Sequence, residues 1–184
     1  MWLPKSLKYI FIKKKLRKIK LFACDIDGVL TNNLLSYNKE GEITRAFNVK
    51  DGLGIKILQK IGIRVCFISG GKGESIKKRA VDLGIADTYL EVKNKKKKLL
   101  DLKNIYKLNS DEIIYIGDDI NDLVVKDLVS LFISPIDGHN QVKKQSDYVT
   151  KAKGGEGVLR EIVDIILDNK EFIKIKKDLW LETN

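Results

Sequence analysis

The chain has 184 residues and a mass of 20.9 kDa, which suits one domain of ordinary size. Hydrophobic residues make up 43% of it and charged residues 33%, and the 2 prolines and 14 glycines exclude collagen-like and low-complexity proteins. The 35 Lys and Arg residues exceed the 25 Asp and Glu residues, giving a net charge of +10. This charge leaves a nucleic-acid-binding protein, or a protein of anionic membrane surfaces, open as a first alternative.

Residues 1–19 form a basic N-terminal extension. Four apolar side chains share one face if this segment is a helix: Leu7, Ile10, Phe11 and Leu16. Such a helix could lie on a membrane surface, but we favour an extension that packs on the domain or on a neighbouring subunit. The apolar run 9–12 is too short for a signal peptide, and no run approaches the length of a membrane span. We therefore expect a cytoplasmic protein without an integral membrane segment.

From residue 20 onward, short apolar runs alternate with segments of helical periodicity. Strands are expected at 21–24, 65–68, 87–91, 113–116 and 131–133, and helices at 53–61, 74–83, 95–106, 121–128 and 157–167. This alternation predicts an α/β fold, a Rossmann-like parallel sheet with helices on both faces. Residues 34–48 look like a β-hairpin inserted after the first strand. Cys24 and Cys66 lie inside the apolar runs and are expected to be buried, reduced thiols.

Polar residues follow three of the expected strands directly. These are Asp25-Ile26-Asp27-Gly28, Ser69-Gly70-Gly71 and Gly117-Asp118-Asp119, and the remaining early strand is followed by a lysine run. In open parallel sheets, ligands bind beyond the carboxyl ends of the strands. Carboxylates without a His or Cys cluster suit Mg²⁺, and a serine followed by glycines suits a phosphate group. Together these residues point to phosphoryl transfer, in which one carboxylate is free to act as the nucleophile.

These motifs resemble those of the haloacid dehalogenase superfamily of phosphatases. Asp25-Ile26-Asp27-Gly28-Val29-Leu30-Thr31 is similar to the first motif, Ser69-Gly70 to the second, and Gly117-Asp118-Asp119-Ile120-Asn121-Asp122 to the fourth. The resemblance is closer to the subfamily of 3-deoxy-D-manno-octulosonate 8-phosphate (KDO 8-phosphate) phosphatases. The stretches 46–55, 148–150 and 154–161 carry that closer resemblance. It covers residues 20–168, the expected phosphatase domain, and leaves 169–184 as a C-terminal tail.

The resemblance implies a role for each residue of the motifs. Asp25 would be the nucleophile that forms an aspartyl-phosphate, and Asp27 the acid/base. Asp25, the main-chain carbonyl of Asp27, and Asp118 would hold Mg²⁺, while Asp119 and Asp122 would orient these groups. Ser69, Gly70 and one lysine would bind the phosphate. Counting from Tyr89 without a gap places that lysine at Lys95, in the run Lys93-Asn94-Lys95-Lys96-Lys97-Lys98.

The intervals between the motifs leave no room for a cap domain, so we expect an uncapped site. The resemblance implies that neighbouring subunits of a homotetramer cover it. The residues implied to contact the substrate, a phosphorylated sugar acid, are Asn48, Val49, Lys50, Asp51, Gly52, Lys56 and Arg79, to which we add Lys72. For Asp51 an alternative stays open, namely that it caps a helix over 52–61.

Two departures from the subfamily pattern bear on the sugar. Related octulosonate phosphatases usually have Arg directly after the glycine of the second motif, and this chain has Gly71 followed by Lys72. At Glu156 the sequence resembles instead the phosphatases that act on nonulosonate 9-phosphates, which are phosphorylated sialic-acid-like sugars. The expected function is therefore KDO 8-phosphate hydrolysis in lipopolysaccharide synthesis, with a nonulosonate 9-phosphate phosphatase as the alternative.

Two non-enzymatic alternatives remain, a basic nucleic-acid-binding protein and a catalytically silent interaction domain. The lysines are scattered, and no aromatic-stacking motif interleaves them, which argues against nucleic-acid binding. The intact Asp25, Asp27, Lys95 and Asp118 argue against a silent domain. His139, the single histidine, is expected in a loop or at a helix cap.

Overall fold

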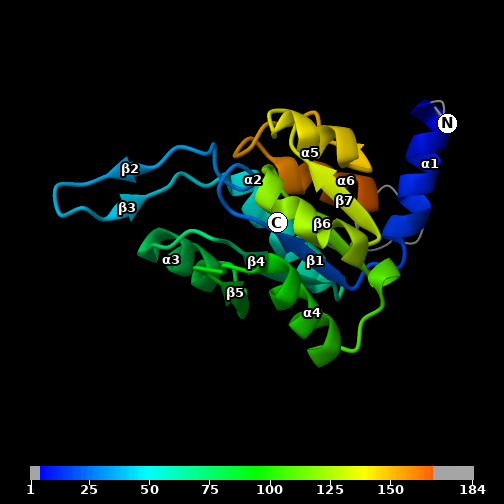
Figure 1. Ribbon diagram of the computed structural model, residues 1–184, viewed down its shortest axis with the longest axis horizontal. Coiled ribbons are helices and arrows are strands. Elements are labelled where there is room, and N and C mark those ends of the chain that lie inside the picture. Colours follow the sequence, from blue (N-terminus) through cyan, green and yellow to red (C-terminus); the bar gives the residue numbers. More distant parts are fainter. Residues whose placement is uncertain (1–4, 168–184) are drawn as a thin grey trace, which may run out of the picture.

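Six parallel strands form the central sheet (Figure 1), in the order β5-β4-β1-β6-β7-β8. The computed structural model of the protein describes residues 5–167, and for residues 5–8 it describes the backbone alone. The strands are β1 (Leu21–Cys24), β4 (Arg64–Ile68), β5 (Asp87–Tyr89), β6 (Ile113–Ile116), β7 (Leu131–Ser134) and β8 (Tyr148–Val149). This sheet confirms the predicted α/β fold class.

Helices cover both faces of the sheet. One face packs against α1 (Lys5–Leu16), α2 (Val49–Lys60), α3 (Glu74–Asp82) and α6 (Val158–Leu167). The other packs against α4 (Lys95–Ile105), the 3-10 helix Ile120–Leu128 and α5 (Asn140–Gln145). Strands β1, β6 and β7 are buried at every position, which is why they show no alternation of apolar and polar residues, Ser134 at the end of β7 being the single hydroxyl-bearing small residue among them.

A hairpin of β2 (Ser36–Tyr37) and β3 (Ile43–Thr44) follows the first strand, as predicted. Figure 1 shows it extending far from the body of the molecule, at the end opposite α1. Both strands are short, and Leu34 and Tyr37 expose about two thirds of their surface, 67% and 65%. The hairpin returns to the body beside α3, where the Ser75 hydroxyl donates to the carbonyl of Ile43.

The N-terminal helix packs on the domain, through a face that matches the predicted one only in part. Ile12 and Leu16 are buried in the core shared with α6, whereas Ile10 and Phe11 are 62% and 50% exposed. The side chain of Leu7 lies outside the described part of the chain. No helix among the described residues is both long enough and apolar enough to cross a membrane. The expected tail, 169–184, also lies outside the described residues.

The secondary structure departs from the prediction in several places. The helix expected over 53–61 is α2, which begins four residues earlier at Val49, and the short 3-10 helix Ser110–Glu112 was not predicted. The helix expected over 121–128 is a 3-10 helix that begins at Ile120, and α5 and β8 were not predicted. The short strand β8 is flanked by polar residues in the sequence, and it is recognised as a strand only by its pairing with β7. Cys24 and Cys66 are free and buried, as expected.

Candidate active site

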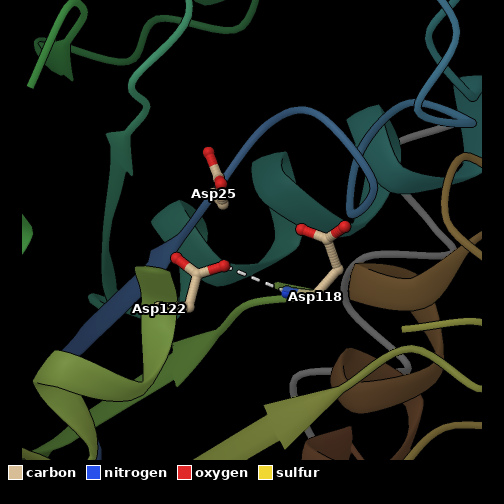
Figure 2. Close-up of side chains that lie close together, drawn as sticks. All are labelled: Asp25, Asp118 and Asp122. Carbon is tan, nitrogen blue, oxygen red and sulfur yellow. Dashed lines mark hydrogen bonds between the residues drawn. The ribbon is translucent and has the colours of Figure 1, made fainter. Parts of the chain in front are cut away.

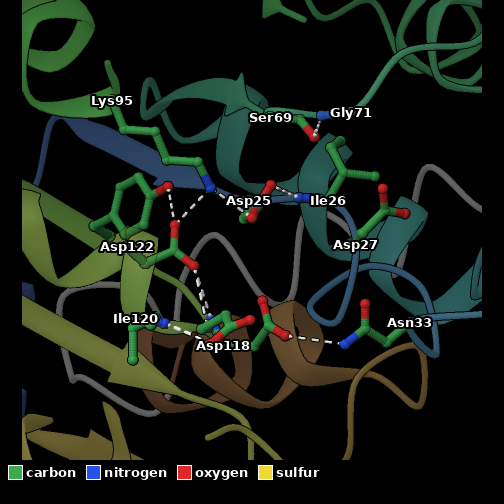
Figure 3. Close-up of polar contacts among 12 residues, drawn as sticks. Asp25, Ile26, Asp27, Asn33, Ser69, Gly71, Lys95, Asp118, Ile120 and Asp122 are labelled. Atoms are coloured by element: carbon green, nitrogen blue, oxygen red, sulfur yellow. Dashed lines mark hydrogen bonds and ion pairs between the residues drawn. The ribbon is translucent and has the colours of Figure 1, made fainter. Parts of the chain in front are cut away.

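The sheet order brings the predicted site residues together. Strands β4 and β6 flank β1, so the residues that follow these three strands meet at one edge of the sheet. Figure 3 shows Asp25, Ser69 and Asp118 around one space, each arriving from a different strand end. All three side chains are buried.

Three carboxylates form the centre of this site (Figure 2). Asp25, Asp118 and Asp122 each offer an oxygen atom, and these oxygen atoms lie within 4.8 Å of one another. Asp122 is fully buried and engaged on both of its oxygens. Its Oδ1 accepts from Lys95 and from the Tyr115 hydroxyl (2.8 Å), and its Oδ2 accepts from the main-chain N–H groups of Asp118 and Asp119. Asp122 therefore orients its neighbours and has little capacity left to bind a ligand.

Lys95 is the cation that contacts the clustered carboxylates. It is 3% exposed at the start of α4, and its ammonium group lies 2.5 Å from Asp25 Oδ2 and 2.7 Å from Asp122 Oδ1. Of the other lysines in the run, Lys93, Lys96 and Lys97 are exposed, and Lys98 lies over the ring of Tyr89. Burial disfavours the charge on Lys95, but the carboxylates of Asp25 and Asp122 outweigh it, so the net pKa of Lys95 is raised.

Asp25 is held at both oxygens. Its Oδ1 accepts from the N–H of Ile26 (2.7 Å) and its Oδ2 from Lys95. Burial and the nearby charge of Asp122 raise the pKa of Asp25 to about 6, against the opposing effect of Lys95. The carboxylate is thus fixed in orientation and poorly solvated, as a nucleophile at a strand end should be.

Asp118 has a higher pKa than Asp25. Burial, together with the carboxylates of Asp122 and Asp25, raises the pKa of Asp118 to about 8. Gly28 leaves it space, since a Cβ atom at that position would lie only 2.0 Å from Asp118 Oδ2. Three acidic side chains and one ammonium leave an excess of buried negative charge, which a divalent cation would neutralise. Two available carboxylates with hard oxygen donors fit Mg²⁺.

The segment after β4 lies opposite these carboxylates. The Ser69 hydroxyl accepts from the N–H of Gly71 at 3.1 Å, which leaves the hydroxyl proton available to a phosphate oxygen. Gly70 is exposed, and its side of the loop is open enough that an added Cβ would meet only the carbonyl of Val92, at 3.9 Å. These positions fit the phosphate-binding role predicted for them, which stays a prediction.

Asp27 points away from the three clustered carboxylates (Figure 3). It is 24% exposed at its side chain, accepts from the Thr31 hydroxyl, and forms a two-point ion pair with Arg45. Arg45 was missed, because it stands just before the stretch 46–55 and is not itself part of any motif that pointed to the site. Tyr115 was also missed, since it reads as one more apolar residue of a buried strand.

Several residues predicted to contact substrate make side-chain contacts within the scaffold, and their role toward substrate stays a prediction. Asn48 caps α2, accepting from the N–H of Lys50 and donating to the carbonyl of Gly155. Asp51 is buried and accepts from the N–H of Arg160, so the interpretation of Asp51 as a cap of its own helix is wrong. Arg79 packs over Gly52 and donates to the Asn48 carbonyl.

Four other predicted contact residues have exposed side chains: Val49, Lys50, Lys56 and Lys72. Asp119 caps the 3-10 helix by accepting from the N–H of Ile120 at 2.7 Å. His139 caps α5 through its Nδ1, which accepts from the N–H of Gln141, as expected. The main-chain N–H of His139 also donates to the carbonyl of Asp118 at 2.7 Å and so steadies the Asp118 loop.

Comparisons with known proteins show which family the chain resembles. The family model of haloacid dehalogenase-like hydrolases matches residues 84–162. The 3-deoxy-D-manno-octulosonate 8-phosphate phosphatase of Escherichia coli (strain B / BL21-DE3) is 35% identical over 156 residues, which cover 85% of this chain and 83% of that protein.

Solved structures give the same result. The structure of the corresponding phosphatase from Yersinia pestis superposes with a TM-score of 0.86 at 33% identity and covers 89% of each chain. That of the phosphatase from Moraxella catarrhalis, in complex with magnesium ion, phosphate ion and KDO, also gives a TM-score of 0.86, at 35% identity, covering 91% of this chain and 97% of that one. The chain therefore belongs to the haloacid dehalogenase-like hydrolases, in the family of the KDO 8-phosphate phosphatases.

Proposed function

We propose that the protein is an Mg²⁺-dependent phosphatase that hydrolyses KDO 8-phosphate to KDO and phosphate. The observation that carries the proposal is the buried pair of Asp25 and Lys95 beside Asp118, at the shared edge of β1, β4 and β6. The sugar is proposed from the named relatives, one of which was solved with magnesium, phosphate and KDO. The relatives give no support to the nonulosonate, nucleic-acid-binding or silent-domain alternatives.

In the first step, a carboxylate oxygen of Asp25 attacks phosphorus, and the bond from phosphorus to the sugar oxygen breaks. A proton from Asp27 goes to that leaving oxygen, which departs as a neutral hydroxyl group. The ammonium of Lys95 and the hydroxyl of Ser69 stabilise the charge on the transferring phosphoryl group. The product is an aspartyl-phosphate on Asp25.

In the second step, water attacks the phosphorus atom of the aspartyl-phosphate, and Asp27 accepts its proton. The bond to Asp25 breaks, phosphate leaves, and both aspartates return to their starting states. Asp25, Asp118 and the main-chain carbonyl of Asp27 are the proposed holders of Mg²⁺, with Asp119 and Asp122 orienting them. The bound Mg²⁺ supplies positive charge that offsets the repulsion between the phosphate and the attacking carboxylate.

The other expectations from the sequence enter the proposal at this point. Exposed side chains at Val49, Lys50, Lys56 and Lys72 remain candidates for substrate contact. The lack of room for a cap domain and the projecting hairpin support a homotetramer in which neighbouring subunits complete the site. The division into an extension (1–19), a phosphatase domain (20–168) and a tail (169–184) is kept as a proposal. Two free, buried cysteines suit a reducing compartment, and we propose the cytoplasm.

A panel of sugar phosphates tests the substrate. Released phosphate is measured with Mg²⁺ present for KDO 8-phosphate, a nonulosonate 9-phosphate and glucose 6-phosphate. We expect kcat/KM for KDO 8-phosphate to exceed that for the hexose phosphate by at least about 100-fold, because a specific site uses contacts the smaller sugar lacks. Preference for the nonulosonate would overturn the sugar assignment, and equal activity on all three would overturn the sugar-acid assignment.

A further inference from the structure

Arg45 ties the end of the projecting hairpin to the proposed acid/base. Its Nε lies 2.7 Å from Asp27 Oδ1, and a terminal nitrogen of the same guanidinium group lies 2.9 Å from Oδ2. The other terminal nitrogen donates to the carbonyl of Lys72 at 3.0 Å. The Arg45 side chain is 1% exposed, so this contact is a largely buried ion pair and not a surface one.

The geometry of this contact fixes an orientation. A planar guanidinium group that meets both oxygens of a carboxylate allows one relative arrangement, whereas a single ammonium group allows many. The Thr31 hydroxyl donates to Asp27 Oδ1 from the other side, at 3.2 Å. Asp27 is less buried than Asp25 and lacks a lysine partner of its own, so Arg45 is the group that determines where its carboxylate points.

The chain leaves space for this pair at Gly71. A Cβ atom on Gly71 would lie 2.9 Å from Asp27 Oδ2 and 3.1 Å from the guanidinium of Arg45. Gly73, two residues later, would bring a Cβ atom to 3.0 Å from the same guanidinium. The loop after β4 therefore accepts the Arg45 side chain between two glycines and a backbone carbonyl. Related phosphatases usually have Arg at the position of Gly71, whereas this chain brings an arginine to that place from the hairpin.

We propose that Arg45 is the positioning residue of Asp27, and that it determines how well the enzyme expels a poorly acidic sugar hydroxyl. The inference rests on the proposed function, in which Asp27 gives its proton to the leaving oxygen as the bond to phosphorus breaks. The charged carboxylate that remains on Asp27 offers two acceptor oxygens, and the guanidinium of Arg45 donates to both. Arg45 does not contact the phosphate or the sugar; it acts through Asp27.

The test compares leaving groups. An alkyl oxygen needs a proton in order to depart, whereas p-nitrophenolate departs without one. We expect Arg45→Gln to lower kcat/KM for KDO 8-phosphate by about 100-fold, in the range of general acid catalysis, and to change kcat/KM for p-nitrophenyl phosphate by less than about threefold. Arg45→Lys, which keeps the charge and loses the two-point contact, should fall between the wild type and Arg45→Gln for the sugar phosphate.

Two further variants make the test specific. Lys39→Gln removes an exposed charge from the same hairpin and should leave both substrates unaffected. In an Asp27→Asn background, Arg45→Gln should add no further loss, because a residue that acts only through Asp27 has nothing left to position. Gly71→Ala keeps Arg45 but crowds the pair, and should reproduce the selective loss on the alkyl substrate even if Arg45→Gln fails to fold.

An equal loss on both substrates would overturn the proposal, because it would mean that Arg45 acts on the phosphoryl group or on the fold. A full further loss in the Asp27→Asn background would also overturn it, by showing direct contact with substrate. The proposed function fails separately, if the wild type hydrolyses p-nitrophenyl phosphate but not KDO 8-phosphate. The Arg45 comparison is then made on an alkyl phosphate that the wild type does hydrolyse.

Discussion

At the scale of single residues, the charged side chains of the site hold one another in fixed positions. Asp25, Lys95 and Asp122 form a buried chain in which one ammonium group holds two carboxylates, and Tyr115 with two main-chain N–H groups holds the second of these. Such a buried arrangement is fixed in geometry because every partner needs its neighbour to offset the loss of hydration. Asp118 is the exception, because burial and the nearby carboxylates of Asp122 and Asp25 raise its pKa.

Gly28 provides a direct test of the metal site. Its backbone has a φ of +80°, and a Cβ atom would lie 2.0 Å from Asp118 Oδ2. Gly28→Ala should displace Asp118 and raise the Mg²⁺ concentration at half-maximal activity by at least about tenfold, the size of effect seen when the orientation of a metal ligand is disturbed. Gly41 is a matched control, with a φ of +78° and no atom within 4 Å of the added Cβ.

Activity titrated with Mg²⁺ distinguishes the two alanine variants. Gly41→Ala carries the same kind of backbone strain and should keep the Mg²⁺ dependence of the wild type. If Gly28→Ala and Gly41→Ala respond to Mg²⁺ alike, Asp118 does not hold the metal.

At the scale of elements, Asp51 connects two helices. It lies in the first turn of α2 and accepts from the N–H of Arg160 near the start of α6, while its Oδ2 is buried with no hydrogen-bond partner. Burial raises the pKa of Asp51 to about 6 from a value of 3.8, although hydrogen bonds from the backbone and the charge of Arg79 oppose the change. The contact joins α2 to α6 through a carboxyl group whose charged form is disfavoured by burial.

The folded protein thus keeps a proton on Asp51 at pH values where the unfolded chain has released it. The Asp51 contribution to the free energy of unfolding is therefore highest below about pH 4, falls by about 3 kcal/mol between about pH 4 and pH 6, and stays level above that. Asp51→Asn keeps an acceptor for Arg160 and removes the charge. We expect the variant to be more stable than the wild type at pH 7.5, on the order of 1–3 kcal/mol, and the difference to vanish near pH 4.

Urea unfolding at a series of pH values measures this difference. The control Asp82→Asn removes an exposed carboxylate and should show no such trend. A variant that is less stable than the wild type by the same amount at pH 4 and pH 7.5 would show that Asp51 acts only as a hydrogen-bond acceptor.

The elements that the sequence predicted best are those whose own residues determine them. The buried strands at 21–24 and 113–116 have no polar positions, and β1 and β6 coincide with them. The strand β8 and the helix α5 depend on tertiary contacts, and no local pattern marks them. The buried face of α1 was assigned wrongly in part, because periodicity leaves open which of two adjacent apolar stripes meets the core.

The same distinction applies to the site. Asp25, Ser69 and Asp118 could be placed because strand ends of a parallel sheet converge, and Lys95 because the family resemblance implied its position. Arg45 and Asp51 could not, since Arg45 reaches Asp27 only after the hairpin folds back, and the burial of Asp51 depends on α6. The sequence predicts which groups lie at the strand ends, whereas long-range packing decides which of the other polar groups reach them.

At the scale of the whole molecule, net charge is a poor guide to chemistry. Of the 35 basic residues, Lys95 and Arg45 are the two whose described contacts bind the proposed catalytic carboxylates. The site itself gathers acidic groups, which would repel a nucleic-acid backbone unless a cation neutralised them. The excess of lysine is therefore compatible with a small anionic substrate.

The most direct measurement is Mg²⁺-dependent release of phosphate from KDO 8-phosphate by the wild type and by Asp25→Asn. We predict turnover by the wild type only with Mg²⁺, and a loss of about 10⁴-fold or more in Asp25→Asn, since removing a covalent nucleophile leaves little of the reaction. Circular dichroism should show that the variant keeps its fold. Turnover of the correctly folded Asp25→Asn at the wild-type rate would contradict the assignment of Asp25 as the nucleophile.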